Sequence, residues 1–284
     1  MSETASHSAN AAQIDYWNAN AGQTWATFQE QLDRQIETLG FEAMRALAPA
    51  PGERIIDVGC GCGQTTLELA ARVTSSGAVT GADISQPMLE VARARVVPGG
   101  SATPEFRQVD AQTGDLGEGV FDAAFSRFGV MFFSDPVAAF TNLRKALKPD
   151  GRLAFVCWQP LQENLWMRAP MEAALPFLPP SPPMDPTAPG PFAFADSDWV
   201  RTILTDAGFT DITLHAFNTS IGGLGIDQTV DLAFRVGPLG AALRENPDCK
   251  AAVEDAVRHA VSQYKTPGGV LMPAAVWIVQ ARIG

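Results

Sequence analysis

The sequence is poor in cysteine and has no long apolar run. The close pair at 60 and 62 has no second pair to complete a zinc site, so we expect reduced thiols and no bound metal. No stretch approaches the ~20 apolar residues of a transmembrane helix. Residues 1–13 lack the basic and then apolar pattern of a secretory signal. These absences predict a cytoplasmic protein without a membrane span.

Basic residues are also scarce. The chain has 20 Lys and Arg against 31 Asp and Glu, a net charge of −11, and no run rich in Lys or Arg. Because an acidic surface repels phosphate backbones, we do not expect a nucleic-acid partner. Of only three histidines, His215 is predicted to be a hydrogen-bonded strand residue and His259 a surface residue, so neither is expected to act as a catalytic base.

A glycine-rich stretch near residue 60 contrasts with these absences. The apolar run at 55–58 predicts a strand buried on both faces. Three glycines then alternate with small residues, and the segment from 65 to 72 has helical character. Glycine permits positive φ and close approach of a ligand to the backbone. The backbone N–H groups of such a turn converge at the positive end of the helix dipole.

The spacing of this turn favours one ligand class over another. A dinucleotide site needs G-x-G-x-x-G, whereas the pattern here is D-x-G-x-G-x-G from Asp57 to Gly63, with Gln64 where glycine is needed. The carboxylate of Asp57 would repel a pyrophosphate but suits a ligand with an ammonium and a sulfonium. A second predicted strand, 78–83, ends at Asp83, which can accept both hydroxyls of a ribose. The alternative is a tight turn followed by a solvated strand-end acid.

Together these two motifs resemble those of class I S-adenosylmethionine-dependent methyltransferases. The similarity is good from 54 to 158 and is nearest to the ubiquinone/menaquinone-methylase-like branch. It implies S-adenosyl-L-methionine as cofactor, with Asp57 at its methionine end, Ile84 and Met88 beside the adenine, and Asp110 against the adenine amino group. For Asp110 a helix N-cap is the alternative. The implied cofactor-binding residues are Asp57, Gly59, Gly61, Gly63, Gln64, Asp83, Ile84, Met88, Asp110, Ala111, Ser126 and Trp25.

The tip of the fourth predicted strand should face the same crevice and meet the methyl acceptor. The expected acceptor-binding residues are Arg127, Phe128, Met131, Trp158 and Trp17. No residue stands out as a general base, so we expect in-line displacement driven mainly by proximity and exclusion of water. The aromatic segments favour a small, apolar or aromatic acceptor. An NAD-dependent oxidoreductase and a non-catalytic S-adenosylmethionine-binding protein are the alternatives.

The predicted fold is α/β: a Rossmann-like, doubly wound sheet of seven mostly parallel strands, the last antiparallel, with helical cap insertions. We expect N-terminal lid helices at 1–48, a cofactor-binding core at 49–160, a helical and proline-rich cap at 161–195, and completion of the sheet at 196–284 with a second helical insertion at about 221–270. Within these, one helix is expected at 161–175, an extended strap at 176–191, and strands at 212–217 and 275–281. The tryptophans of the N-terminal segment could pack on the core, close over the cofactor, or both.

Overall fold

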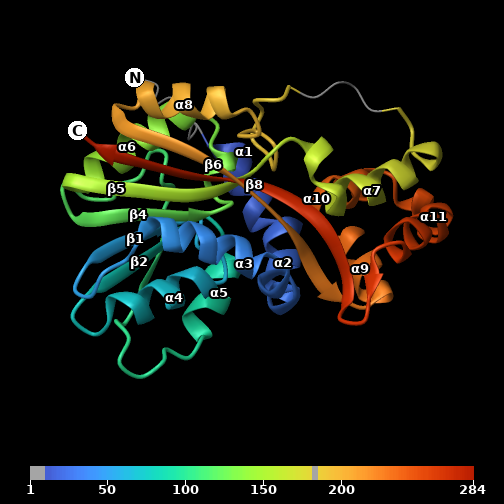
Figure 1. Ribbon diagram of the computed structural model, residues 1–284, viewed down its shortest axis with the longest axis horizontal. Helices are drawn as coiled ribbons and strands as arrows, with labels where there is room; N and C mark the ends of the chain where they lie inside the picture. The colour runs from blue at the N-terminus through green and yellow to red at the C-terminus, as the bar shows by residue number, and fades with distance from the viewer. Residues whose placement is uncertain (1–9, 181–184) are drawn as a thin grey trace, which may run out of the picture.

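A computed structural model describes residues 10–180 and 185–284 of the chain. Its centre is a mixed sheet in the order β3-β2-β1-β4-β5-β8-β6, with the short β7 paired to β8 (Figure 1). The first five strands of this order run parallel, and β8 is antiparallel to both of its long neighbours. The expected doubly wound sheet with an antiparallel last strand is confirmed. The strands are β1 Arg54–Val58, β2 Ala78–Asp83, β3 Glu105–Gln108, β4 Phe121–Arg127, β5 Leu147–Trp158, β6 Phe209–Leu224, β7 Lys265–Thr266 and β8 Gly269–Ile283.

Helices cover the sheet on both faces. In Figure 1, α6 and α8 lie at the top beside β5 and β6, while α4 and α5 lie at the bottom beside β1 and β2. The long α3 packs against β4, β5, β6 and β8. The helices of this core are α3 Gln29–Leu47, α4 Gln64–Val73, α5 Gln86–Ala94, α6 Pro136–Ala146 and α8 Ser197–Asp206.

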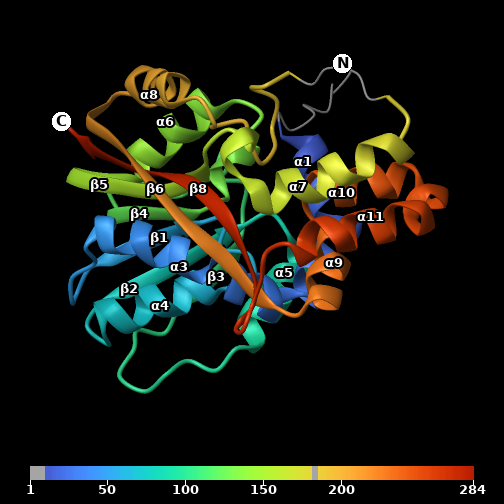
Figure 2. The same cartoon turned by 45° about the vertical axis from the view of Figure 1, so that its right-hand side comes forward.

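A helical cap stands beside the sheet, at the right of Figures 1 and 2. It combines α7 with three helices inserted between β6 and β8, and these helices share a hydrophobic cluster of their own around Val253, Val257 and Val261. Strands β6 and β8 are longer than expected because their pairing continues past the sheet, as far as Leu224 opposite Val270, to carry the cap. The cap helices are α7 Leu165–Ala174, α9 Ile226–Ala233, α10 Gly237–Glu245 and α11 Lys250–Ser262.

The single helix expected at 161–175 is wrong in one respect: a short 3-10 turn at Leu161–Glu163 precedes α7. The break falls at Asn164, whose buried side chain donates to the carbonyls of Gln159 and Ala275 and accepts from the N–H of Ala275. Asn164 thus ties the start of the cap to β8. The extended strap expected at 176–191 is wrong at both ends: it begins in a 3-10 helix, Leu175–Phe177, and residues 186–191 form turns and bends. Residues 181–184 lie outside the described part.

Two further helices, α1 Ala11–Asn18 and α2 Asn20–Thr27, precede the core helices and pack against each other, and α2 also packs against α5. No helix among the described residues is long and apolar enough to cross a membrane.

The core between the sheet and the α6 layer is built around one aromatic ring. Phe140 of α6 is fully buried. Its ring lies within 5.6–6.4 Å, between centroids, of four others. These are the rings of Phe133, Phe155, Phe194 and Phe209. Since protein interiors are close-packed, a void at the centre of such a cluster would not close fully.

We therefore expect Phe140→Ala to lower the free energy of unfolding by about 3–5 kcal/mol, from lost transfer energy and a residual cavity. The measurement is urea unfolding followed by circular dichroism. Phe177→Ala is the control, because Phe177 is 42% exposed and should cost under about 1 kcal/mol. Equal effects of the two substitutions would contradict the assignment of Phe140 to the centre of the core.

Candidate functional site

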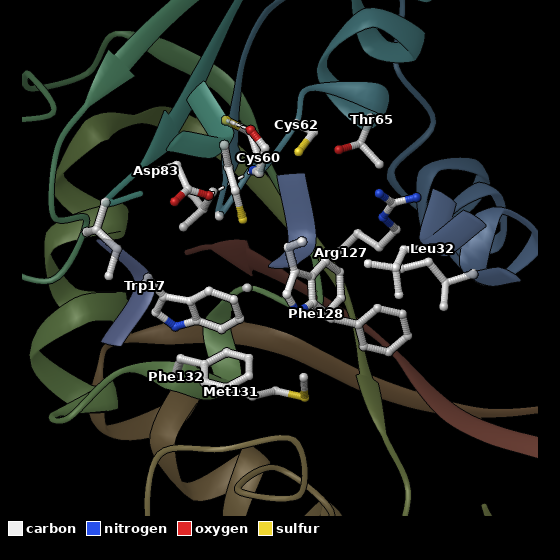
Figure 3. A pocket seen from close by; sticks show the side chains of 18 of the residues that line it. Trp17, Leu32, Cys60, Cys62, Thr65, Asp83, Arg127, Phe128, Met131 and Phe132 are labelled. Atoms are coloured by element: carbon white, nitrogen blue, oxygen red, sulfur yellow. Dashed lines mark hydrogen bonds between the residues drawn. The ribbon is translucent and has the colours of Figure 1, made fainter. Parts of the chain in front are cut away.

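A pocket of about 180 Å³ opens where β1, β2 and β4 end (Figure 3). One ordered water needs only about 10–15 Å³, so the space admits a small organic molecule. Its wall combines residues from these strand ends with residues of α1 to α3 and of the cap. The sequence-predicted residues on this wall are Trp17, Trp25, Gly59, Gly61, Asp83, Ile84, Met88, Asp110, Ala111, Arg127, Phe128, Met131 and Trp158.

The floor of the pocket is the glycine turn between β1 and α4. Gly59, Gly61 and Gly63 all have positive φ, at +66°, +54° and +82°. A Cβ on Gly59 would stand 2.7 Å from Cα of Gly129, and a Cβ on Gly129 would stand 2.7 Å from the carbonyl oxygen of Val58. The loops after β1 and β4 therefore touch backbone to backbone. Gly129 was not singled out from the sequence, although it follows a predicted strand end.

Asp83 lies on the pocket wall at the end of β2. Its Oδ2 accepts from the N–H of Gly61 at 2.8 Å and its Oδ1 from the N–H of Ser85 at 2.8 Å. Burial raises the pKa of Asp83, and these backbone donors partly oppose that shift. The carboxylate thus holds the glycine turn beside the β2–α5 turn and retains lone pairs for ligand hydroxyls.

Four predicted residues lie behind the wall rather than on it. Asp57 is fully buried, and its Oδ2 accepts from the hydroxyls of Thr65 and Thr66 at 2.7 and 2.6 Å. In this structure Asp57 braces the start of α4 from below the turn. The other three are Gly63, Gln64 and Ser126.

Each of these three has a bracing contact of its own. A Cβ on Gly63 would meet Ala92 of α5 at 2.9 Å, so this glycine allows close helix packing. Ser126 donates to the carbonyl of Val58 at 2.7 Å and so joins β4 to β1. Gln64 accepts a hydrogen bond from the guanidinium of Arg127.

Asp110 lies on the wall beyond the end of β3. Its Oδ1 accepts from the N–H of Gln112 at 2.9 Å and from the side-chain amide of Asn10 at 3.2 Å. Its Oδ2 accepts from the hydroxyl of Thr113 at 3.1 Å. The helix N-cap expected as the alternative for Asp110 is wrong, because no regular helix follows it; its carboxylate instead caps a local turn. Ala111 and Ile84 are neighbours on the same wall.

Helices α1 and α2 close one side of the pocket and dock on the β2–α5 turn. The side chain of Asn18 donates to the carbonyl of Ile84 and accepts from the N–H of Gln86, both at 2.9 Å. The hydroxyl of Ser85 donates to the carbonyl of Trp17 at 2.7 Å. Trp17 then lies edge-to-face with Phe132, with ring centroids 5.0 Å apart. Figure 3 shows the two side chains next to each other. The N-terminal tryptophans pack on the core and also line the pocket.

The other side of the pocket is an aromatic wall. Phe128 stacks on Trp158 with centroids 4.2 Å apart and planes 11° apart, and Trp158 contacts Trp166 of α7 at 5.0 Å. Phe128 adopts φ +60°, a conformation that non-glycine residues rarely take. Such strain gathers at functional sites, where surrounding contacts hold it. Here the strain turns the ring of Phe128 onto Trp158 directly after β4.

An ion-pair network that the sequence did not reveal surrounds Arg127. Arg127 donates to Oδ1 of Asp33 on α3 at 2.8 Å, and Arg95 donates to Oδ2 of Asp33 at 2.9 Å. Gly40 of α3 makes room for the arginine, because a Cβ there would lie 2.7 Å from its Cδ. Asp33 falls on the apolar face of a predicted helix. An acidic residue at such a position was the one feature of the sequence that could have indicated this network.

Cys60 and Cys62 both line the pocket, and their sulfurs are labelled in Figure 3. Burial raises the pKa of the Cys60 thiol, and raises that of the Cys62 thiol to about 12. Both thiols are therefore protonated at neutral pH and are poor nucleophiles. Within the ranges 10–180 and 185–284, no group of three or more His, Cys, Asp and Glu side chains is arranged to hold a metal ion.

Residues 56–155 match the family described as "Methyltransferase domain". The chain is 35% identical over 107 residues to aklanonic acid methyltransferase DauC from Streptomyces sp. (strain C5), which covers 38% of this chain and 49% of that protein. It is 38% identical over 109 residues to demethylmenaquinone methyltransferase from Clavibacter sepedonicus, covering 38% and 42%. Residues 56–155 of this chain therefore form a methyltransferase domain. The chain spans about half the length of the curated relatives it matches.

The fold of this methyltransferase domain also recurs among solved structures. Phosphoethanolamine N-methyltransferase 2 from Haemonchus contortus, in complex with phosphomonomethylethanolamine and S-adenosylhomocysteine, has a TM-score of 0.58 at 16% identity. The superposition covers 97% of this chain and 60% of that one. At this identity the likeness concerns the fold alone.

S-adenosylmethionine is the cofactor of this class of domain, and the pocket fits it chemically. The glycine turn exposes backbone where a Cβ on Gly61 would lie 3.1 Å from Cε of Met88. The Asp83 carboxylate on the same wall can accept from hydroxyls. The apolar side chains of Ile84, Met88 and Val109 line the same pocket and suit a flat aromatic base.

Burial of Asp57 leads to a pH-dependent prediction. Burial raises its pKa to about 6, despite the opposing Thr66 and Thr65 hydroxyls. Between about pH 4 and pH 6 the folded chain therefore holds a proton that the unfolded chain has lost, so stability should fall as pH rises through this window and then level off. Across this pH window, the free energy of unfolding of wild type should fall by up to about 3 kcal/mol relative to that of Asp57→Asn.

Urea unfolding of both proteins from pH 4 to pH 8 measures this difference directly. Subtracting the two stability curves removes the titration of the other carboxylates. A difference that stays constant across the range would contradict the assignment.

Docking of α1 and α2 leads to a second prediction. A Cβ on Gly22 would lie 2.0 Å from the carbonyl oxygen of Trp17 and 2.6 Å from the hydroxyl of Ser85. Gly22→Ala should therefore separate these helices from the β2–α5 turn and speed amide hydrogen exchange across 11–27 by about tenfold or more. Gln23→Ala, at an exposed position of the same helix, should leave exchange unchanged. Slow exchange in both variants would show that the docking tolerates the added methyl group.

Proposed function

We propose that this protein transfers the methyl group of S-adenosylmethionine to a small molecule with an apolar or aromatic body. The observation that carries the proposal is that one pocket combines Asp83 and the glycine turn with the stacked Phe128–Trp158 pair. The first group suits the cofactor and the second suits the acceptor. Two relatives are named as methyltransferases of aklanonic acid and of demethylmenaquinone, and these names agree with an acceptor of this class.

On the cofactor side, Asp83 would accept from the ribose hydroxyls while its bonds to Gly61 and Ser85 keep it in place. The exposed backbone of Gly59 and Gly61 would lie along the ligand. Ile84, Met88 and Ala111 would flank the base, with Asp110 at its polar edge. Gly63, Gln64, Ser126 and Asp57 would act from behind the wall by holding the turn, and Trp25 would contribute from the lid.

On the acceptor side, Phe128, Trp158 and Met131 would hold an apolar ring, and Trp17 with Phe132 would cover it. When bound, the cofactor supplies an activated methyl group on a sulfonium with a good leaving group. The task of the chain is then to hold the acceptor in line and to exclude water. Arg127 would stay paired with Asp33 and shape the end of the pocket near α3.

Among the described residues that line the pocket there is no histidine. Asp33 is paired with two arginines, and both thiols are protonated at neutral pH. The other two lining carboxylates, Asp83 and Asp110, accept backbone N–H bonds and would serve the cofactor, so no described lining group is left as a base for the acceptor. Proximity and desolvation are the main contributions that this pocket can make, which favours an acceptor that is already nucleophilic.

A nicotinamide-dependent oxidoreductase is the less favoured reading of this sheet. The turn has Gln64 in place of the glycine of the dinucleotide pattern, and Asp57 lies close beneath it. A non-catalytic protein would bind the cofactor in the same way, and only the absence of methyl transfer would distinguish it from the proposed enzyme.

Isothermal calorimetry with S-adenosylmethionine, S-adenosylhomocysteine and NADH tests the cofactor half of the proposal. Wild type should bind both adenosyl ligands with micromolar affinity, about −8 kcal/mol, and should not bind NADH. Asp83→Asn should weaken adenosyl binding by about 1–3 kcal/mol, because charged hydrogen bonds to the ribose are lost.

The matched control is Asp122→Asn. Asp122 also accepts from a backbone N–H, that of Arg54, but near the starts of β1 and β4, at the other end of these strands from the pocket. The Asp122→Asn variant should bind the ligands as wild type does. Binding of NADH, or equal losses in the two variants, would contradict the proposal.

A further inference from the structure

A second, smaller hollow of about 30 Å³ adjoins the main pocket under the cap. It lies between α7, the α9–α10 connection and the outer ends of β6 and β8, and its wall is almost entirely apolar, including Pro170, Ile221, Leu239 and Met272. Four residues line both spaces and so form the boundary between them. They are Gln35, Trp166, Met167 and Val236.

Two polar atoms at this boundary are buried without a hydrogen-bond partner. They are Oε1 of Gln35 on α3 and Nε1 of Trp166 on α7. An unpaired buried polar atom is costly, so native structures seldom leave two on the residues of one boundary without a use. One atom is an acceptor and the other a donor, and each belongs to a side chain facing both spaces.

The aromatic wall leads to this boundary. Trp166 contacts Trp158 at 5.0 Å, and Trp158 stacks on Phe128 at 4.2 Å. A ring held against Phe128 and Trp158 would therefore extend toward Trp166. Beyond the boundary, 30 Å³ admits two or three heavy atoms, since one water needs about 10–15 Å³.

We propose that Gln35 and Trp166 select an acceptor that carries a hydroxyl group on an apolar ring with a short alkyl substituent. The hydroxyl donates to Oε1 of Gln35 and accepts from Nε1–H of Trp166, and the substituent enters the small hollow. A hydroxyl satisfies both atoms at once, whereas a carbonyl or an ether oxygen only accepts. A carboxylate finds no free cation there, because Arg127 is paired with Asp33.

This inference rests on the proposed function and concerns recognition, whichever atom receives the methyl group. Gln35 and Trp166 are specificity residues in it. It differs from the general preference of an apolar pocket, because such a pocket alone would favour a hydrocarbon over the phenol of the same shape.

The experiment measures binding of two probes to the chain saturated with S-adenosylhomocysteine. 2-Ethylphenol carries the hydroxyl next to the ethyl group, and 2-ethyltoluene replaces the hydroxyl by a methyl group. Wild type should bind the phenol about 3- to 10-fold more tightly, as expected for one or two net hydrogen bonds. Trp166→Phe and Gln35→Leu should each weaken phenol binding by about 3- to 10-fold and change 2-ethyltoluene binding by less than about twofold.

Matched controls are Trp277→Phe and Gln280→Leu, whose side chains donate to Ala195 and Ala46 away from both spaces. They should retain the preference for the phenol. Unchanged binding of S-adenosylhomocysteine and unchanged near-ultraviolet circular dichroism show that each variant is folded.

Three results would overturn the inference: no preference for the phenol in wild type, a preference that survives both boundary substitutions, or no binding of either probe to the S-adenosylhomocysteine complex. Binding of S-adenosylhomocysteine itself is measured first. A chain that fails to bind it overturns the proposed function, whereas a chain that binds it without preferring the phenol overturns this inference alone.

Discussion

The site depends on the contact between two glycines at the tips of β1 and β4. The strand order reverses between these neighbours, since the chain goes from β1 outward to β3 and then returns to β4. Loops leaving such a pair of strands diverge and open a crevice. Here the crevice keeps a closed floor, because Gly59 and Gly129 approach to a distance that excludes any Cβ. Ser126 reinforces this floor through its bond to Val58, and Asp57 supports it from below through α4.

From this floor the pocket rises between two walls that differ in chemistry and in origin. The wall from β2 and β3 offers carboxylates and backbone groups, each held by local hydrogen bonds. The wall from β4 and β5 offers stacked aromatic rings and continues into the cap through Trp166. Helices α1 and α2 bridge the two walls, because they dock by polar contacts on the first and present Trp17 to Phe132 beside the second.

Features with a local cause were predictable from the sequence. The alternation of Gly59, Gly61 and Gly63 after an apolar run, and the acid ending the next strand, indicated both the turn and Asp83 correctly. Features that need partners far along the chain were not. Asp33 meets Arg127 across 94 positions, and Asn164 meets β8 across 111. Asp57 is an intermediate case. The sequence showed an acid at the end of the first strand, but its hydrogen bonds from Thr65 and Thr66 depend on how the following helix orients these two hydroxyls.

The family match covers the sheet core and leaves out the cap. The family match ends at residue 155, before the cap begins, and the curated relatives align over about 38–50% of the chain. The cap has its own hydrophobic cluster around α11 and joins the core through the extended β6–β8 ribbon and Asn164. Substitutions inside that cluster can therefore change the small apolar hollow under the cap without disturbing the glycine floor. The stacked Phe128 and Trp158 belong to the main core, as the glycine floor does, and only the part of the pocket beyond Trp166 rests on the cap's own cluster.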